Sequence, residues 1–335
     1  MSTAVPGVTT LRDDATGLVA AVAVDRLVDG RAAGGIRLRS YPDESSLRDD
    51  AVSLARAMTR KCAIAGIRCG GAKTVVWADR LRDRRAALGI LGRHVETLGG
   101  ALYAGPDFGF TDDDRDAMAA TTRYVDSPHV SAGLGEATAL GVREALAAAL
   151  GTGSLAGTRI AIQGLGKVGG ALARVLRAEG VRVYGHDTLP DRVSEAGAEP
   201  IDERRVFEGD WDAVAPCALG GAIDLRRAAV LRCRAVVGGA NDLLAPPEEE
   251  VARVLAARGI VHVPDVVANA GALIHWATLV LAGGTPGDAG AAVRRIGGTA
   301  RRILDRARAE HRTPWEVVRA MAEEFSAPAR PDFAS

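Results

Sequence analysis

Two lysines, Lys61 and Lys73, flank a glycine-rich stretch of the chain, and their type and spacing suit proton chemistry. We expect Lys61 near the end of a helix and Lys73 at the start of a strand, so that both ammonium groups converge on one cleft. Neighbouring ammonium groups lower each other's pKa, and burial lowers it further. A lysine shifted towards neutrality can act as a general base, while one that stays charged can hold a substrate carboxylate.

Asp107 is the carboxylate best placed to work with these lysines. It lies in the segment GPDFG (105–109), where the glycines let the backbone turn sharply after a strand. A carboxylate beside a lysine at that point forms a proton-transfer pair. The alternative is an ordinary ion pair, and spacing alone leaves both interpretations open.

Lysine and asparagine are scarce in this chain. Of its 42 basic residues only Lys61, Lys73 and Lys167 are lysines, and its only asparagines are Asn241 and Asn269. Such a composition is typical of a GC-rich coding genome, under which a surface lysine is replaced by arginine at little cost. Arginine cannot replace a compact ammonium group whose pKa must shift. The surviving lysines and asparagines are therefore candidates for chemistry, with chance survival as the alternative.

A dinucleotide-binding pattern, G-x-G-x-x-G, is formed by Gly164, Gly166 and Gly169. The pattern follows an apolar strand, TRIAIQ, and opens a helix, and Asp187 ends the next strand. These glycines permit a tight turn and a close approach of the backbone to a pyrophosphate, which the N-terminus of the helix attracts. The alternative is a glycine-rich turn in an α/β domain that binds no nucleotide.

Asp187 favours NAD over NADP, because its carboxylate accepts hydrogen bonds from the ribose hydroxyls and repels a 2′-phosphate. His186 and Arg192 lie nearby and weaken that preference. Lys167 and Val168 lie inside the glycine-rich loop, and we expect them beside the cofactor without a catalytic role.

The overall composition argues against several classes of protein. The 335 residues include 42 basic and 42 acidic ones, so the chain lacks the basic surplus expected of a nucleic-acid-binding protein. No apolar run approaches the length of a membrane span, and the N-terminus lacks the pattern of a signal peptide. The cysteines and histidines lack metal-ligand spacing. We therefore expect a cytoplasmic protein that binds neither nucleic acid, membrane nor metal.

Hydrophobic periodicity indicates the elements that must position these residues. The first half mixes strands and helices: we expect strands at 18–25 and 74–78, and helices at 46–60 and 81–97. A long helix at 137–151 leads into the second half. From residue 158 onwards, apolar strands alternate with helices, which predicts a doubly wound parallel sheet of the Rossmann type.

We therefore predict an α/β fold with two domains and a cleft between them. Residues 1–130 form the domain for substrate binding, catalysis and oligomerisation, and residues 131–305 form the dinucleotide-binding domain. Residues 306–335 form a C-terminal helical segment that we expect to pack back towards the first domain.

A series of ordered segments across residues 10–280 resembles the Glu/Leu/Phe/Val dehydrogenase family, in particular its leucine, valine and phenylalanine dehydrogenases, with a lean towards actinobacterial phenylalanine dehydrogenases. These segments are AAGGIR (32–37), ARAMTRK (55–61), GGAKTVV (70–76), AGPDFGF (104–110), ATALGV (137–142), GLGKVGG (164–170), APCALGG (215–221), VVGGAND (236–242) and PDVVANAGALIH (264–275). The resemblance implies a homo-oligomer that uses NAD to convert an apolar L-amino acid, reversibly, to a 2-oxo acid and ammonia.

The resemblance also implies roles for the residues that carry it. Lys73 is the base that activates water, Asp107 exchanges protons with the amino group, and Lys61 binds the substrate carboxylate. Other groups are implied at the polar end of the substrate: the backbone N–H groups of Gly34 and Gly35, and the side chain of Asn269.

Further roles concern the nicotinamide and the substrate side chain. Thr138 is implied to bind the carboxamide, and Ala240 and Asn241 to line the nicotinamide ribose. The pocket for the substrate side chain is implied to include Met58, Leu273 and Trp276. Trp276 either narrows this pocket towards valine, stacks on an aromatic substrate or points into the core, and all three interpretations stay open.

The sequence departs from the family pattern at two glycines. Ala72 replaces the third glycine of GGGK, which matters if that position needs a positive φ, and Ala272 replaces the second glycine of NAGG. Two alternative functions also stay open. One is a dehydrogenase for an unusual aromatic amino acid in secondary metabolism, and the other is an NAD-binding homologue without catalysis.

Overall fold

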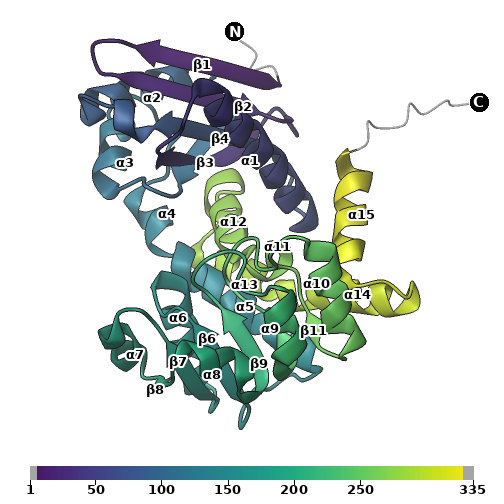
Figure 1. The fold of residues 1–335 in the computed structure, drawn as a ribbon. Coiled ribbons are helices and arrows are strands. Elements are labelled where there is room, and N and C mark those ends of the chain that lie inside the picture. The colour runs from purple at the N-terminus through teal and green to yellow at the C-terminus, as the bar shows by residue number, and fades with distance from the viewer. Residues whose placement is uncertain (1–5, 327–335) are drawn as a thin grey trace, which may run out of the picture. The chain divides into compact units, whose positions relative to one another are not determined.

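The computed structural model describes residues 6–326, and the chain divides into two compact units, Met1–Ala132 and Gly133–Ser335 (Figure 1). Residues 1–5, at the start of the first predicted domain, and residues 327–335, at the end of the predicted C-terminal segment, lie outside the described residues. The described part of the predicted C-terminal segment, 306–326, belongs to the second unit. That residues 306–335 pack back towards the first domain stays a prediction.

A five-stranded mixed sheet forms the centre of the first unit, in the order β1-β2-β4-β3-β5. β1 pairs antiparallel with β2 and β2 with β4, whereas β3 is parallel to β4 and β5. β3 is absent from the elements predicted from the sequence, because its adjacent glycines, Gly34 and Gly35, weaken the pattern of a strand. The strands are β1 (Gly7–Asp13), β2 (Leu18–Val24), β3 (Ala32–Arg39), β4 (Gly70–Trp77) and β5 (Leu102–Pro106).

Helices cover both faces of this sheet. α1 packs on one face, where Leu47, Ala51 and Ala55 join Val75 in a buried cluster. α2 covers the other face, where Leu88 and Leu91 are buried with alternate residues of β2 and β4. The helices of this unit are α1 (Glu44–Ile64), the short 3-10 helix η1 (Ala78–Arg80), α2 (Arg84–Thr97), α3 (Asp112–Ala119) and α4 (Pro128–Ala132).

The second unit contains a six-stranded sheet in the order β11-β10-β9-β6-β7-β8, and its paired strands are parallel. Its first strand, β6, lies between β7 and β9, so the strand order reverses at the end of β6, where dinucleotides bind in such sheets. The predicted doubly wound sheet is confirmed. The strands are β6 (Arg159–Gln163), β7 (Arg182–His186), β8 (Glu199–Pro200), β9 (Asp210–Pro216), β10 (Arg232–Val236) and β11 (Val261–His262).

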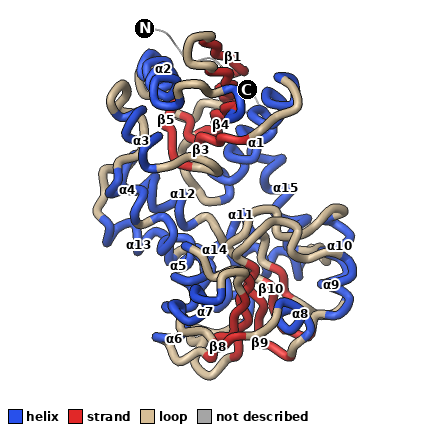
Figure 2. Tube along the Cα trace, turned by 60° about the vertical axis from the view of Figure 1, so that its left-hand side comes forward, coloured by secondary structure: helices blue, strands red, loops and turns tan. Residues whose placement is uncertain are grey.

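Helices lie on both sides of this second sheet (Figure 2). Among the described residues, none forms a helix with the length and apolar character of a membrane span. α14 packs on α5, and α15 contacts both α10 and α14, with an ion pair of 3.0 Å between Arg253 and Glu316. The helices are α5 (Leu134–Leu150), α6 (Lys167–Ala178), α7 (Pro190–Ala196), α8 (Glu203–Glu208), α9 (Leu225–Val230), α10 (Glu248–Ala257), α11 (Asp265–Ala268), α12 (Gly271–Trp276), the π-helical turn η2 (Ala277–Leu281), α13 (Pro286–Arg294), α14 (Ile296–Ala309) and α15 (Pro314–Ser326).

Candidate active site

Strand alternation places Lys73 on the face of the first sheet that α1 covers. Side chains alternate between the two faces of a strand, and Val75, two residues further along β4, is buried against α1. Gly71, two residues before Lys73, has no room for a side chain, because a Cβ atom there would lie 2.2 Å from the carbonyl oxygen of Ala55 in α1. The close packing of α1 on β4 therefore buries Lys73, whose side chain is only 7% exposed.

Lys73 and Asp107 form a direct ion pair, with 2.7 Å between Nζ and Oδ2. They come from opposite sides of β3, since β4 pairs with one edge of β3 and β5, which leads into Asp107, pairs with the other. Gly35 of β3 makes the ion pair possible. A Cβ atom at Gly35 would lie 2.8 Å from Cβ of Asp107 and 3.1 Å from Nζ of Lys73. The structure therefore brings Lys73, Asp107 and Gly35 together.

The two charged groups shift each other's pKa in this partly buried environment. Burial lowers the pKa of Lys73, and the neighbouring Asp107 only partly offsets that effect. Burial acts to raise the pKa of Asp107, but the positive charges of Lys73 and Arg37 outweigh it and hold the pKa below its usual range. A lysine with a lowered pKa next to an ionised carboxylate is suited to proton transfer.

Three further residues on this face were not identified from the sequence. Nε of Arg37 donates to Oδ2 of Asp107 at 2.9 Å, and Nη1 of Arg37 lies 3.6 Å from Oδ2 of Asp50 in α1. The hydroxyl of Tyr41 also donates to Asp50. The position of Arg37, two residues after Gly35 in the same strand, is the sequence signal that could have revealed it, provided that β3 had been recognised.

Gly35→Ala is expected to lower kcat by about 100-fold, because a displacement of about 1 Å in a reacting group has an effect of that size. The added methyl group would push Asp107 and Lys73 apart. Steady-state kinetics of the purified variant would measure this loss. Gly89→Ala in α2 is the matched control, because its Cβ would have only ordinary contacts, at 3.8 Å or more. Equal kcat values for the two variants would contradict this role of Gly35.

Ala72 fits the structure without strain, although the family pattern has glycine at this position. It lies within β4, is fully buried and pairs with Val24 of β2. It is not among the residues with positive φ, so its methyl group is compatible with the backbone. Gly34 is the position nearby that has no room for a side chain, because a Cβ atom there would lie 1.7 Å from the carbonyl oxygen of Ala72.

Lys61 and Met58 lie one turn apart near the C-terminal end of α1, and both are partly exposed. Between them, Thr59 fixes the helix to the sheet. Its hydroxyl donates to Oδ2 of Asp25 at 2.6 Å and accepts from the backbone N–H of Gly71 at 3.1 Å. The end of α1 that carries Lys61 is thus held close to the strand that carries Lys73.

The glycine-rich loop of the second unit has the form that a dinucleotide requires. Gly164 has a φ of 83°, and a Cβ atom at Gly169 would lie 1.9 Å from the carbonyl oxygen of Gly164. Gly166 caps α6 without a side-chain hydrogen bond, and a Cβ atom there would meet only Nη1 of Arg192, at 3.9 Å. The free N–H groups at the start of α6 and the open approach at Gly166 fit a pyrophosphate. Lys167 is exposed beside them.

Asp187 follows β7, and its carboxylate organises the same loop. Oδ2 accepts from the backbone N–H of Leu165 at 2.7 Å, and Oδ1 accepts from that of Leu189 at 2.9 Å. Nη1 of Arg192 lies 3.6 Å from Oδ1. Each carboxylate oxygen can accept a second hydrogen bond, so the group remains able to bind ribose hydroxyls.

The two asparagines of the chain meet in the second unit. Nδ2 of Asn269 donates to Oδ1 of Asn241 at 2.8 Å. Oδ1 of Asn269 is buried and has no hydrogen-bond partner among the described residues. A buried acceptor without a partner has a substantial energetic cost, so this oxygen is suited to a donor on a ligand. Ala240 is buried beside them.

Thr138 and Val168 lie on two helices of the same unit. The hydroxyl of Thr138 donates to the carbonyl oxygen of Leu134 at 2.9 Å and can still accept a hydrogen bond. Val168 packs so closely on Gly239 that a Cβ atom at Gly239 would lie 2.6 Å from Cγ1 of Val168. The polar and apolar groups predicted around the cofactor thus belong to one unit.

Leu273 and Trp276 lie one turn apart on α12. Leu273 is partly exposed, whereas Trp276 is only 6% exposed. The interpretation that Trp276 points into the core agrees with this burial. A role for Trp276 in substrate selection stays a prediction.

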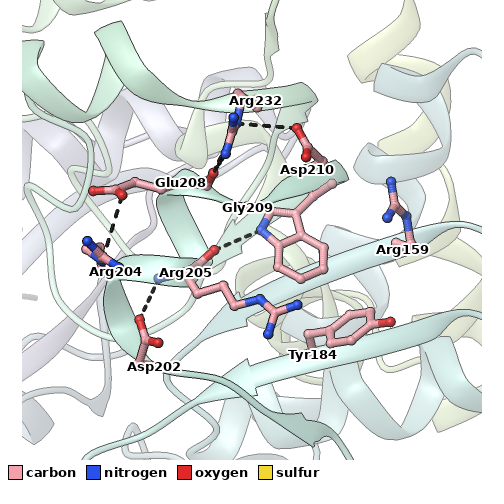
Figure 3. A pocket seen from close by; sticks show the side chains of 10 residues that line it. Arg159, Tyr184, Asp202, Arg204, Arg205, Glu208, Gly209, Asp210 and Arg232 are labelled. Carbon is pink, nitrogen blue, oxygen red and sulfur yellow. Dashed lines mark hydrogen bonds and ion pairs between the residues drawn. The ribbon is translucent and has the colours of Figure 1, made fainter.

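Figure 3 shows a hollow in the second unit. It has a volume of about 400 Å³ and is lined by arginines, among them Arg159 and Arg232. Arg159 begins β6 and Arg232 begins β10, whereas the glycine-rich loop follows the end of β6. The hollow therefore lies at the amino ends of these strands, opposite to the glycine-rich loop at their carboxyl ends. No residue predicted for the site lines it.

Known proteins are similar to this chain over most of its length. The family model described as "Glu/Leu/Phe/Val dehydrogenase, dimerisation domain" matches residues 12–124, and "Glutamate/Leucine/Phenylalanine/Valine dehydrogenase" matches residues 186–278. Leucine dehydrogenase of Thermoactinomyces intermedius is 34% identical over 81% of this chain and 77% of its own length. Phenylalanine dehydrogenase of Bacillus thermotolerans is 35% identical over 79% of this chain and 74% of its own length.

The fold of this chain is also similar to that of a solved structure. The crystal structure of L-tryptophan dehydrogenase from Nostoc punctiforme has a TM-score of 0.83 and 30% sequence identity, with 96% of this chain and 95% of that chain covered. The similarity therefore includes both units.

Proposed function

Because this chain belongs to the Glu/Leu/Phe/Val dehydrogenase family, we propose that it catalyses the reversible, NAD-dependent oxidative deamination of an apolar L-amino acid to the 2-oxo acid and ammonia. The observation that carries this proposal is the ion pair between buried Lys73 and Asp107, at 2.7 Å. The dinucleotide-type loop around Gly164 and Gly166 supports it. A charged substrate side chain is disfavoured, because Met58, Leu273 and Trp276 are all apolar.

Each residue of the proposed site has a role in the chemistry. Lys61 holds the carboxylate of the amino acid, and Asn269 binds its polar end. Bound nicotinamide supplies the acceptor for the hydride that leaves Cα. The substrate is then an imine. Neutral Lys73 takes a proton from water as the water oxygen bonds to the imine carbon.

Asp107 completes the reaction by passing a proton to the substrate nitrogen. Lys73 meanwhile releases to solvent the proton that it took from water. The carbon–nitrogen bond then breaks, ammonia leaves with the bonding electron pair, and the hydroxyl group passes its proton to the neutral lysine as the carbon becomes the carbonyl of the 2-oxo acid. The lowered pKa of Lys73 supports its part in this sequence, since a lysine of ordinary pKa would stay protonated near neutral pH.

NAD is proposed as the cofactor because Asp187 lies where a 2′-phosphate would meet a carboxylate. Asp187→Ser is expected to raise KM for NAD by about 10-fold, which corresponds to the loss of about 1.4 kcal/mol of binding energy. It is also expected to reduce the preference for NAD over NADP. Kinetics with each cofactor would measure both effects. A wild-type enzyme that prefers NADP would contradict the assignment, and Arg192→Ala would then test whether Arg192 binds the phosphate.

The substrate is tested by a panel of amino acids. We expect NADH formation at alkaline pH with one or more of L-Leu, L-Val, L-Ile, L-Phe and L-Trp, and none with their D-enantiomers. No activity across this panel, with NAD binding intact, would contradict the proposal.

An unusual aromatic amino acid is the second candidate substrate. The extended similarity to L-tryptophan dehydrogenase favours an aromatic side chain, which this candidate shares with L-Phe and L-Trp of the panel. Non-standard aromatic L-amino acids in the same panel would distinguish it. A kcat/KM at least about 10-fold above that of every standard amino acid would support this candidate. That ratio corresponds to about 1.4 kcal/mol of added transition-state stabilisation. The ion pair of Lys73 and Asp107 argues against the third alternative, a homologue that binds NAD without catalysis.

We also propose that the protein is a homo-oligomer. The family model that matches residues 12–124 is described as a dimerisation domain, and β1 lies at the edge of the first sheet, where its outer side can pair with another strand. Light scattering after size-exclusion chromatography would test this, and a mass of 34.7 kDa would indicate a monomer.

A further inference from the structure

The carboxylate of Asp107 is held on one side by two cations. Nζ of Lys73, at 2.7 Å, and Nε of Arg37, at 2.9 Å, both contact Oδ2. Among the described residues, the ion-pair contact of each cation with Asp107 is to Oδ2 rather than to Oδ1. The side chain of Asp107 is 26% exposed, so the carboxylate is accessible to a ligand although it is paired. Its two oxygens therefore have different surroundings.

The guanidinium group of Arg37 also interacts with a second carboxylate. Nη1 lies 3.6 Å from Oδ2 of Asp50 in α1, and Asp50 also accepts a hydrogen bond from Tyr41. Because Arg37 lies on β3 and Asp50 on α1, the guanidinium group connects the sheet to the helix that covers it. A planar guanidinium can hold two carboxylates in a defined geometry, which a lysine cannot do.

We propose that Arg37 is a positioning residue that fixes the orientation of Asp107, so that Oδ1 exchanges the proton with the substrate nitrogen. This inference rests on the proposed function. Arg37 keeps its own protons, because a guanidinium group is not deprotonated in proteins. The proton moves from the substrate ammonium group to Oδ1 and returns to the nitrogen before ammonia leaves, so the carboxylate ends as it began.

Arg37 also contributes to the charge balance of the cluster. The groups that face Asp107 are Lys73 from β4 and Arg37 from β3, and Asp50 of α1 and Tyr41 face Arg37. Arg37 lowers the pKa of Asp107 and also that of Lys73. Loss of its positive charge therefore raises both pKa values, and the pH profile of the enzyme moves to higher pH.

The test compares Arg37→Gln and Arg37→Lys with a matched control, Arg68→Gln. Arg68 also pairs with an aspartate, but its side chain is 81% exposed and its partner, Asp29, is not one of the proposed site residues. We expect Arg37→Gln to lower kcat by about 10- to 100-fold, as expected for a misplaced reacting group, and to shift the pH profile upwards. Arg37→Lys keeps the charge but not the geometry, so kcat falls while the profile stays near that of the wild type.

Carbon-13 NMR titration of the Asp107 carboxyl provides a readout that needs no substrate. The titration of Asp107 is expected to move to higher pH in Arg37→Gln and to stay unchanged in Arg68→Gln, with the Asp107→Asn spectrum used to assign the signal. An unchanged titration and an unchanged pH profile in Arg37→Gln would overturn the inference. Absence of amino-acid turnover in the wild type would instead refute the proposed function, while the titration would still decide the role of Arg37.

Discussion

Lys73→Ala is expected to lower kcat by about 100- to 10,000-fold, the range typical of the loss of a general base. The side chain is buried and paired with Asp107 at 2.7 Å, and alanine has no group that could take up the proton in its place. NAD binding is expected to be largely unchanged, since the glycine-rich loop belongs to the other unit. Steady-state kinetics and fluorescence titration of bound cofactor would measure the two effects.

Lys73→Arg separates base catalysis from charge. Arginine restores a positive charge beside Asp107, but it does not lose a proton in the accessible pH range. We therefore expect this variant to be nearly as inactive as Lys73→Ala. In the wild type, the rate of deamination should rise with pH as Lys73 loses its proton, with a midpoint below the ordinary lysine pKa of 10.5, because burial lowers the pKa of this group. Substantial activity in Lys73→Arg would show that the lysine serves only as a charge.

Asp107→Asn is expected to produce a loss of similar size, about 100- to 10,000-fold in kcat. The amide cannot accept and return a proton as the carboxylate does. It also removes the negative charge that favours protonated Lys73, so the pKa of Lys73 falls further in this variant. The base is then neutral at lower pH, yet turnover remains slow because proton transfer to the nitrogen is lost.

Asp114→Asn is the matched control for Asp107→Asn. Asp114 is also an aspartate paired with an arginine, Arg84; it is buried and takes part in the capping box of α3. Its replacement is expected to lower the free energy of unfolding by about 1–3 kcal/mol but to leave kcat of the folded protein near the wild-type value. If both variants lost kcat equally, the effect of Asp107→Asn would reflect folding rather than proton transfer.

The residue types of the proposed site could be predicted more easily than the arrangement that holds them. Lys73 was found because lysine is rare in this chain, and Gly164 and Asp187 because their spacing is tied to a strand–turn–helix unit. Arg37 could not be found in the same way, since it is one of many arginines. Because lysine is rare in this chain and arginine is abundant, composition pointed to Lys73 but not to Arg37.

The strand pairing of the first sheet could not be predicted from the sequence either. The ion pair crosses β3, a strand that contains two adjacent glycines and therefore lacks the usual apolar pattern. Only the register of β3 with β4 and β5 shows that Gly35 lies between Lys73 and Asp107. Long-range pairing of this kind depends on tertiary packing, which a local pattern does not encode. The second sheet was predictable because alternating strands and helices have few alternative arrangements.

The central claim is that the chain oxidatively deaminates an apolar L-amino acid, and product stoichiometry tests it most directly. The purified protein would be incubated with NAD and the best amino acid of the panel, and NADH, ammonia and 2-oxo acid would be measured in the same sample. We predict equal amounts of the three products in the wild type, and none above background in Lys73→Ala. NADH without ammonia, or equal activity in the two proteins, would contradict the account.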